Sequence, residues 1–291
     1  MWLKGVLLVL LALVVVIVAV ISYGAARWQA GTEKLHAEMQ DARSRTGTKT
    51  YDPREIADLP SPVQRYFHAV LKDGQAQVAA VDIEHTGTFN MGEDAERWRP
   101  FTSSQRVVTR RPGFVWDARI LMAPGLTVFV RDAYVAGRGV LAARLLGFVT
   151  VMEQPSTPEL AQGELIRFLA EAAWYPTALL PSQGVHWEPI DDVRASATLT
   201  DGANTARLVV EFDTQGLISS VSSEARYREV RGVQVATPWQ GRFWDYQPHD
   251  GMLIPLEGEV AWLLPDGPKP YWRGRIRRIE YEYARQATAS M

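Results

Sequence analysis

The sequence predicts an α+β fold that is mainly β, with an N-terminal transmembrane helix followed by a large curved antiparallel sheet and a covering helix. Three observations predict it. The chain begins with an unbroken apolar run, its hydrophobic period changes from 3.6 to 2 residues near Val78, and a capped helical pattern interrupts the strands at Ser156. Nothing marks a second folded domain. We therefore expect an anchor, a juxtamembrane linker, a single β-rich extracytoplasmic domain and a tail at residues 1–26, 27–50, 51–286 and 287–291.

The composition excludes several classes of function. The 291 residues carry a formal net charge of −2, so the chain has no basic surface of the kind that binds nucleic acid. Hydrophobic residues make up 47%, which is enough to bury a core. There is no cysteine, which excludes disulfides, thiol catalysis, cysteine-bound zinc, iron–sulfur clusters and a lipid anchor on cysteine.

The N-terminal run has the length of a membrane span. Residues 6–21 are all apolar, and the stretch from Gly5 to Ala26 contains 22 residues without a charge. As a helix this stretch is about 33 Å long, and a bilayer has a hydrocarbon core of about 30 Å. Trp2 and Tyr23 flank it, where aromatic rings favour the interface. Residues 5–26 are therefore the expected contact with a membrane.

Two other interpretations of this run stay open. A cleaved signal peptide has a shorter apolar region, although residues 24–26 would fit a small-residue cleavage site. A buried core helix would have a polar face, which this run lacks. The flanking charges, Lys4 before the run and Arg27, Lys34 and Arg43 after it, are nearly balanced. We expect a single-pass protein of the inner (cytoplasmic) membrane with its C-terminal domain outside the cytoplasm.

Helices are also expected between the apolar run and the first strand. Residues 27–50 are polar and predict a short helix followed by a linker. Residues 52–55, Asp-Pro-Arg-Glu, form a capping box with proline at the first helical position. A second helix opens at Ser61-Pro62 and ends at Asp73-Gly74, and its apolar face consists of Val63, Phe67, Val70 and Leu71.

Roughly ten strands follow, with one helix among them. The clearest strand patterns cover residues 78–85, 114–121, 126–135, 208–212, 225–235, 239–246, 256–264 and 271–283. Residues 156–159, Ser-Thr-Pro-Glu, cap the interrupting helix, which runs to about Trp174. Its apolar face needs a partner, and the inner face of the curved sheet is the expected one.

The final hairpin predicts two further features. Apolar residues change parity along the last strand, so a β-bulge near Arg277-Arg278 would keep them on one face. Arg273, Arg275 and Arg277 alternate on the other face, where Glu257 and Glu259 of the preceding strand can pair with them. Contact of these arginines with anionic lipid headgroups is the alternative.

Three segments carry a resemblance to a known family. Residues 60–67, 122–125 and 164–181 resemble a family of uncharacterised bacterial membrane-anchored proteins that share a domain of unknown function, over about residues 58–284. More loosely, a long antiparallel meander with an inserted helix is similar to the periplasmic lipoprotein-carrier fold. That resemblance implies an unclosed half-barrel whose apolar concave face holds acyl chains; it implies no function by itself.

One charged cluster and the tryptophans are candidate site residues. Glu164, Arg167 and Glu171 share one helical face, which favours either a solvated, ion-paired stripe or an arginine held by two carboxylates to meet a ligand anion. Large rings on a curved sheet usually pack a core, but they can also line an apolar cavity. The candidate ligand-binding residues are Trp98, Trp116, Glu164, Arg167, Glu171, Trp174, Tyr175, Trp239, Trp244 and Trp262.

No metal, cofactor or catalytic motif is present in the sequence. The five histidines lack metal-ligand spacing, there is no nucleophile elbow, and the glycines at 137 and 139 do not complete a phosphate loop. The leading hypothesis is a membrane-tethered domain that binds a lipid or another lipophilic molecule in the cell envelope. An envelope protein-interaction or sensor module is the alternative, with its protein partner unidentified. A hydrolase that uses Glu164, Glu171 or His186 is the third.

Overall fold

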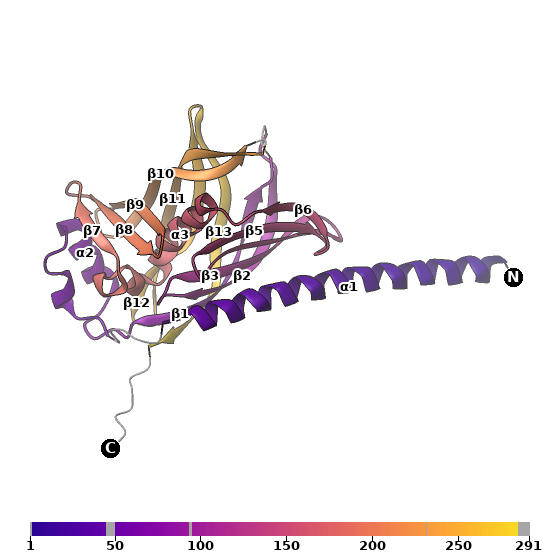
Figure 1. Cartoon of the computed structure of the whole chain (residues 1–291), viewed down its shortest axis with the longest axis horizontal. Helices are drawn as coiled ribbons and strands as arrows, with labels where there is room; N and C mark the ends of the chain where they lie inside the picture. Colours follow the sequence, from indigo (N-terminus) through magenta and orange to yellow (C-terminus); the bar gives the residue numbers. More distant parts are fainter. Residues whose placement is uncertain (1, 45–49, 93–94, 231, 285–291) are drawn as a thin grey trace, which may run out of the picture.

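A long helix projects from one side of a curved β-sheet (Figure 1). The computed structural model describes residues 2–44, 50–92, 95–230 and 232–284. Helix α1 (Trp2–Ala42) comes first, and the 3-10 helix η1 (Pro53–Ile56) and helix α2 (Ser61–Val70) follow. The expected tail at 287–291 lies outside the described residues.

The thirteen described strands form one antiparallel sheet in the order β6-β5-β4-β3-β2-β1-β13-β12-β11-β10-β9-β8-β7. The predicted α+β, mainly β class with a curved antiparallel sheet is therefore confirmed. The strands are β1 (Val78–Asn90), β2 (Trp98–Val108), β3 (Gly113–Ala123), β4 (Leu126–Val135), β5 (Arg138–Leu145), β6 (Val149–Gln154), β7 (His186–Pro189), β8 (Arg194–Asp201), β9 (Asn204–Phe212), β10 (Ile218–Val230), β11 (Val233–His249), β12 (Met252–Leu264) and β13 (Gly267–Tyr283).

The edge strands β6 and β7 do not pair with each other, and the helical segment between them lies on the concave face. This segment consists of α3 (Pro158–Glu171), η2 (Ala172–Trp174), η3 (Pro176–Leu179) and η4 (Pro181–Gln183). Thr157 caps α3 by accepting a hydrogen bond from the Leu160 amide. Leu165, Phe168 and Leu169 are buried in the core cluster, so the inner face of the sheet is the partner of α3. The result is a half-barrel with a covering helix, as expected.

The predicted β-bulge in the last strand is present. The pairing of β13 with β1 skips Arg277, because Arg278 lies opposite Glu84 and Ile276 lies opposite the next residue. Ile276 and Ile279 are both buried although their positions have opposite parity. The change of parity in the sequence therefore corresponds to an irregularity in the pairing of β13 with β1.

The strand boundaries differ from the prediction in one hairpin. Residues 225–235 were expected to form one strand, but β10 ends at Val230 and β11 begins at Val233. Gly232 has a φ of +79°, in the left-handed region that suits a tight turn. Ala225 and Tyr227 before this turn have the same parity as Val233 and Val235 after it, which is why a pattern of period 2 does not reveal the turn.

The predicted linker is also different. Helix α1 runs without a break to Ala42, so residues 27–42 continue the apolar run as one helix. Trp28 and Met39 are buried against the outer face of the sheet, where Met39 packs with residues of β2, β3 and β4. Helical phase places the polar residues of this segment toward solvent, which gave it the appearance of a linker. Residues 45–49 lie outside the described residues.

Polar contacts fix α1 to the sheet. Trp28 donates from Nε1 to both carboxylate oxygens of Asp117, at 2.9 and 3.0 Å. Thr32 donates to the same carboxylate at 2.7 Å, and the Arg131 guanidinium lies 4.1 Å from the centroid of the Trp28 ring. The side chains before Gly24 are exposed, and this part of the helix is long and apolar enough to be a membrane span or a signal sequence.

Candidate functional site

A buried charged group lies between α3 and the concave face of the sheet. The Arg167 guanidinium contacts Asp132 of β4 at 2.6 Å and Glu171 of α3 at 2.7 Å. The same guanidinium lies 4.8 Å from the ring centroid of Phe114 and 5.0 Å from that of Trp116. Arg167 is therefore held by two carboxylates, as one interpretation of the sequence required, but the second carboxylate comes from the sheet.

Glu164 has a different partner. Arg226 of β10 donates from Nη2 to the Glu164 carboxylate at 3.2 Å and from Nε to the Gly163 carbonyl oxygen at 3.1 Å. Its third contact, also at 3.1 Å, is with the hydroxyl of Tyr271, which in turn accepts a hydrogen bond from the indole of Trp239 at 2.9 Å. Glu164 is only 3% exposed. The interpretation of Glu164, Arg167 and Glu171 as a solvated stripe is therefore wrong.

Burial determines the protonation of this group. Burial, and next the negative charge of Asp132, raise the pKa of Glu164 well above its usual value, against the opposing effect of Arg226. Protonated Glu164 can donate a hydrogen bond to the Asp132 carboxylate, and each of these two residues has one buried oxygen that otherwise lacks a partner. With that proton in place, two carboxylates face two guanidiniums and the buried charges balance.

An aromatic layer with a histidine adjoins the charged group. His85 of β1 lies 5.0 Å from Trp174 and 6.0 Å from Trp272, measured between ring centroids. Burial, and next the positive charge of Arg167, lower the pKa of His85 to about 3, so this imidazole is neutral at physiological pH. Its Nδ1 lies 3.3 Å from the hydroxyl oxygen of Ser103.

Four more buried polar atoms in this layer have no hydrogen-bond partner among the described residues. They are His85 Nε2, Gln105 Oε1, Trp116 Nε1 and Trp174 Nε1. Gln105 donates to Glu171 at 2.6 Å and lies opposite Trp116 in the sheet, so these atoms belong to one neighbourhood. Because buried polar atoms are normally hydrogen-bonded, this neighbourhood has the capacity to engage a small polar group.

Apolar side chains remain partly exposed on the concave face beyond α3. The rings of Trp262 and Tyr271 stack with centroids 5.6 Å apart, and Phe89 lies 5.9 Å from Tyr271. Val260 is half-buried beside them, and the Arg228 guanidinium lies 5.8 Å from the Trp262 ring. Strands β1 and β10–β13, which carry these residues, extend past α3 (Figure 1). We call Phe89, Val260, Trp262 and Tyr271 the aromatic patch.

Two of the ten candidate residues lie elsewhere. Trp98 lies beneath the Arg273 guanidinium, 4.4 Å from its ring centroid, and Trp244 donates to Glu257; both are on the outer face of the sheet. Strand parity is the reason, because each is adjacent along its strand to a residue that points inward. The residues on the concave side or buried beneath it are Trp116, Glu164, Arg167, Glu171, Trp174, Tyr175, Trp239 and Trp262.

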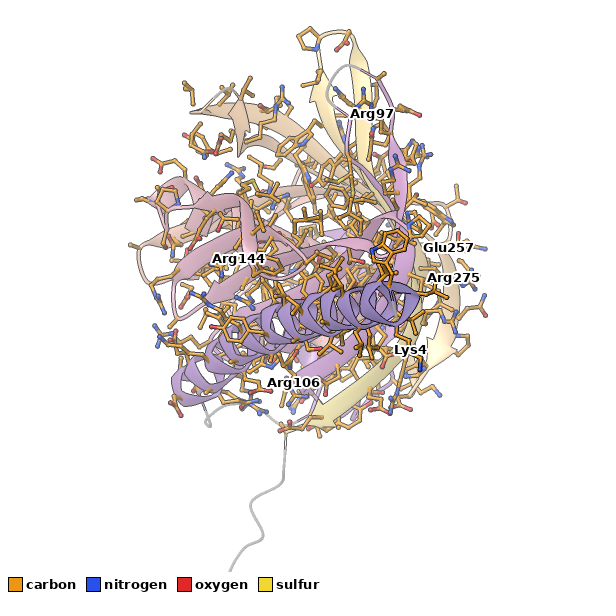
Figure 2. The ribbon with its side chains drawn as sticks, turned by 90° about the vertical axis from the view of Figure 1, so that its right-hand side faces the viewer. Lys4, Arg97, Arg106, Arg144, Glu257 and Arg275 are labelled. Carbon is orange, nitrogen blue, oxygen red and sulfur yellow. The ribbon has the colours of Figure 1, made fainter. Side chains whose placement is uncertain are left out.

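Other predicted groups have structural positions. Arg273 pairs with Glu259 at 2.7 Å, and Arg275 pairs with Glu257, which confirms the predicted cross-strand pairs; Figure 2 shows the second pair side by side. His186 is exposed on the edge strand β7. Among the described residues, no three histidine, aspartate or glutamate side chains are grouped so that they could hold a metal ion.

Sequence reasoning missed several residues of this site. Asp132 and His85 each occupy an inward position within a strand whose inward neighbours are not polar, and Gln105 lies between the inward residues Ser103 and Val107; a polar residue at such a position is a usable signal. Arg226 and Tyr271 offer no such signal. Both lie beside irregularities in the ladder, between β10 and β11 and between β12 and β13, which alter the parity.

A comparison with protein families identifies the group to which the chain is related. The model of a family of unknown function, DUF6920, matches residues 57–281. The chain belongs to this family. The expected membership of a family of unknown function is thus confirmed, with nearly the expected limits.

Two solved structures show a distant likeness to this DUF6920 protein. A LolA superfamily protein from Nitrosomonas europaea has 12% sequence identity and a TM-score of 0.34, covering 76% of this chain and 92% of its own. A β-barrel-like protein with a domain of unknown function, DUF1849, from Brucella abortus has 10% identity and a TM-score of 0.28, covering 71% and 99%. No curated protein matches the sequence significantly.

Proposed function

We propose that this DUF6920 protein is a membrane-tethered domain that binds a lipid or another lipophilic molecule of the cell envelope. The observation that carries the proposal is the aromatic patch, which leaves large rings partly exposed on a concave face. Apolar surface that can be removed from water contributes about 25 cal/mol per Å² on binding, and aromatic rings present the most area per residue.

The tether is α1. Its exposed residues 2–23 would be about 33 Å long, which suits a bilayer. Residues 24–26, the possible cleavage site, are helical here, and Gly24 is buried against the β5–β6 hairpin. A buried site within a helix supports retention of the segment. We place the domain outside the cytoplasm, and an alkaline phosphatase fused to the C-terminus should be active; an inactive fusion in an export-competent strain would contradict this orientation.

The chemistry around the patch favours an amphiphile. Apolar chains would pack on Phe89, Trp262 and Tyr271, while Arg228 is half-buried at the side of Trp262 and its guanidinium could donate hydrogen bonds to an anionic or polar head. Within the part of the chain that the structure describes, the polar contact of the Arg228 side chain is a hydrogen bond of 3.3 Å from Nε to the Thr237 hydroxyl. A lipid with an acyl chain and a phosphate or carboxylate head therefore matches both the aromatic patch and the Arg228 guanidinium.

Photo-crosslinking tests this proposal without confusing bound lipid with the lipid around α1. The full chain would be reconstituted in nanodiscs that contain a phospholipid with a diazirine on its acyl chain, and crosslinked peptides would be mapped by mass spectrometry. We expect crosslinks on β1, β12 and β13 in addition to those on α1. The double variant F89A/W262A should lose the strand crosslinks, while W244A, which truncates a tryptophan on the outer face, should keep them. Crosslinks confined to α1 would refute the proposal.

A protein-interaction module is the second candidate, and the two unpaired edges of the sheet favour it. The strand order ends at β6 and β7 among the described strands, and such edges accept an added strand from a partner. A pull-down from envelope extract with the full chain should then recover one stoichiometric protein. Glu188→Pro on β7 should abolish its binding, and Glu188→Ala should not.

A further inference from the structure

We propose that the β3–β4 and β5–β6 hairpins enter the headgroup layer of the same bilayer that α1 crosses. The proposal rests on the tether described above and adds a second membrane contact to it. We call residues 121–126 and 145–152, which include the two turns, the apolar hairpins.

The apolar hairpins lie where α1 leaves the domain. A Cβ atom built on Gly24 would be 2.5 Å from the Leu146 carbonyl oxygen and 2.7 Å from the Phe148 ring, so the helix backbone touches the β5–β6 turn directly. The two hairpins are neighbours, because the Leu146 amide donates to the Thr127 carbonyl oxygen at 2.9 Å. In Figure 1 the β5–β6 hairpin points along α1 toward its N-terminus.

The position of α1 in the bilayer determines the depth at which the apolar hairpins lie. The apolar run ends at Ile21, and Gly24 follows three residues later, at a rise of about 1.5 Å per residue. The contact at Gly24 is therefore about 5 Å beyond the end of the run. The headgroup layer on each side of the hydrocarbon core is about 5–8 Å thick. The exposed residues 2–23 form a helix about 33 Å long, and the hydrocarbon core is about 30 Å thick. A helix that spans the core with these residues therefore places Gly24, and the β5–β6 turn against it, at the border between the core and this layer.

The side chains at the hairpins suit this environment. Leu121 is 44% exposed, Leu126 39%, Val149 47% and Val151 59%. Neither hairpin contains an ionisable residue from 121 to 128 or from 145 to 152. Every other hairpin turn between described strands has an ionisable residue in the turn or directly beside it, as shown by Glu96, Arg110, Arg138, Asp191, Asp201, Asp213, Arg231, Asp250 and Asp266.

The arrangement does not depend on a mobile connection. α1 continues without a break from the exposed run to Ala42, and Trp28 is hydrogen-bonded to the buried carboxylate of Asp117 on β3. The domain and the exposed helix therefore move as one unit, and the hairpins stay beside the helix. Figure 2 views the molecule from the side toward which α1 projects, with Lys4 near its free end.

Single labelled cysteines test the proposal, because the chain has no cysteine to remove. The full-length variants Leu126→Cys and Val149→Cys would carry an environment-sensitive fluorophore and be reconstituted in vesicles of phosphatidylcholine and phosphatidylglycerol, with or without lipids that bear a shallow doxyl quencher. Val233→Cys is the matched control: it is 62% exposed, also next to a hairpin turn, and lies on the β10–β11 hairpin away from α1.

We expect blue-shifted emission and quenching at positions 126 and 149, and neither at position 233. A probe at Val14, in the middle of the apolar run, separates this proposal from the tether when the vesicles also contain a lipid with a doxyl quencher deep on its acyl chain. If the probe at 14 is quenched while those at 126 and 149 behave like the probe at 233, the hairpin contact is refuted and the tether stands. If the probe at 14 is not quenched, the tether itself is refuted and the hairpin contact with it.

Discussion

The side chain that organises the interior is Glu164. It sits between an arginine that favours its charged form and an aspartate that opposes it, and burial decides in favour of the neutral acid. A carboxylic acid kept neutral in this way is a hydrogen-bond donor, and the network needs that donor, because Asp132 and Glu164 each present a buried oxygen without another partner.

The first prediction concerns the pH dependence of stability. The pKa of Glu164 is higher in the folded protein than in the unfolded chain, so folding binds a proton and stability from this source falls as pH rises above the unfolded value. Glu164→Gln mimics the neutral acid and should remove this dependence. In urea unfolding, the free energy of unfolding of the variant should therefore increase relative to that of the wild type as pH rises above about 4.5. The increase should stop at the pKa that Glu164 has in the folded protein.

Glu159→Gln is the control for this experiment, because it removes a carboxylate from the first turn of the same helix, away from the charged group. The difference in free energy of unfolding between Glu159→Gln and the wild type should not show the pH dependence expected for Glu164→Gln. A difference between Glu164→Gln and the wild type that stays constant with pH would show that Glu164 is ionised in the folded protein.

The second prediction concerns the arginine beside it. Arg226→Met removes the guanidinium that contacts Glu164, Gly163 and Tyr271 and should lower the free energy of unfolding by about 1–3 kcal/mol for each buried oxygen that is left without a donor. The double variant Glu164→Leu/Arg226→Met should be more stable than Arg226→Met alone. Equal losses in the two variants would indicate that the cost comes from packing and not from the unpaired carboxyl group.

At the scale of elements, local patterns predicted what depends on one strand or one hairpin. The bulge at Arg277 and the ion pairs of Arg273 and Arg275 follow from parity within β12 and β13. The sequence did not predict the environment of α3, because an amphipathic pattern is normally interpreted with its polar face toward water. Here β4 and β10 supply Asp132 and Arg226 to that face, and only the curvature of the sheet brings these strands to the helix.

The third prediction concerns the docking of α1. Asp117 accepts hydrogen bonds from Trp28 and Thr32 and is also paired with Arg119, so Asp117→Ala leaves the buried indole N–H without an acceptor. We expect α1 to loosen from the sheet while the sheet stays folded. Spin labels on the exposed positions Glu33 and Thr102 should give a narrow distance distribution in the parent chain and a broad one in the variant.

Ser104→Ala, an exposed position on the same face of β2, is a control that should keep the distribution narrow. A narrow distribution in Asp117→Ala as well would show that the apolar contacts of Met39 hold the helix without the polar ones.

At the scale of the molecule, the sequence predicted the class of fold but not the pairing that joins the two halves of the sheet. Sequential hairpins were expected, yet the pairing of β1 with β13 joins two halves that are far apart in the chain. Long-range pairing of this kind depends on the whole sheet, which no local window contains. The site was also only partly predictable. The sequence shows which residues are tryptophans, but whether each ring points inward or outward depends on the register of the strands.

Because α1 is continuous, the thickness of the bilayer should affect the orientation of the domain relative to the membrane. Apolar spans tilt further in thinner bilayers, and α1 has no joint at which a tilt could be absorbed. We therefore expect the whole half-barrel to lean with the helix, so that energy transfer from a dye on Val233→Cys to a dye at the lipid surface changes with acyl-chain length. Replacing Ala25 and Ala26 with glycine should weaken this coupling, and equal responses in both proteins would argue against it. The orientation of the concave face would then be set by the thickness of the surrounding bilayer.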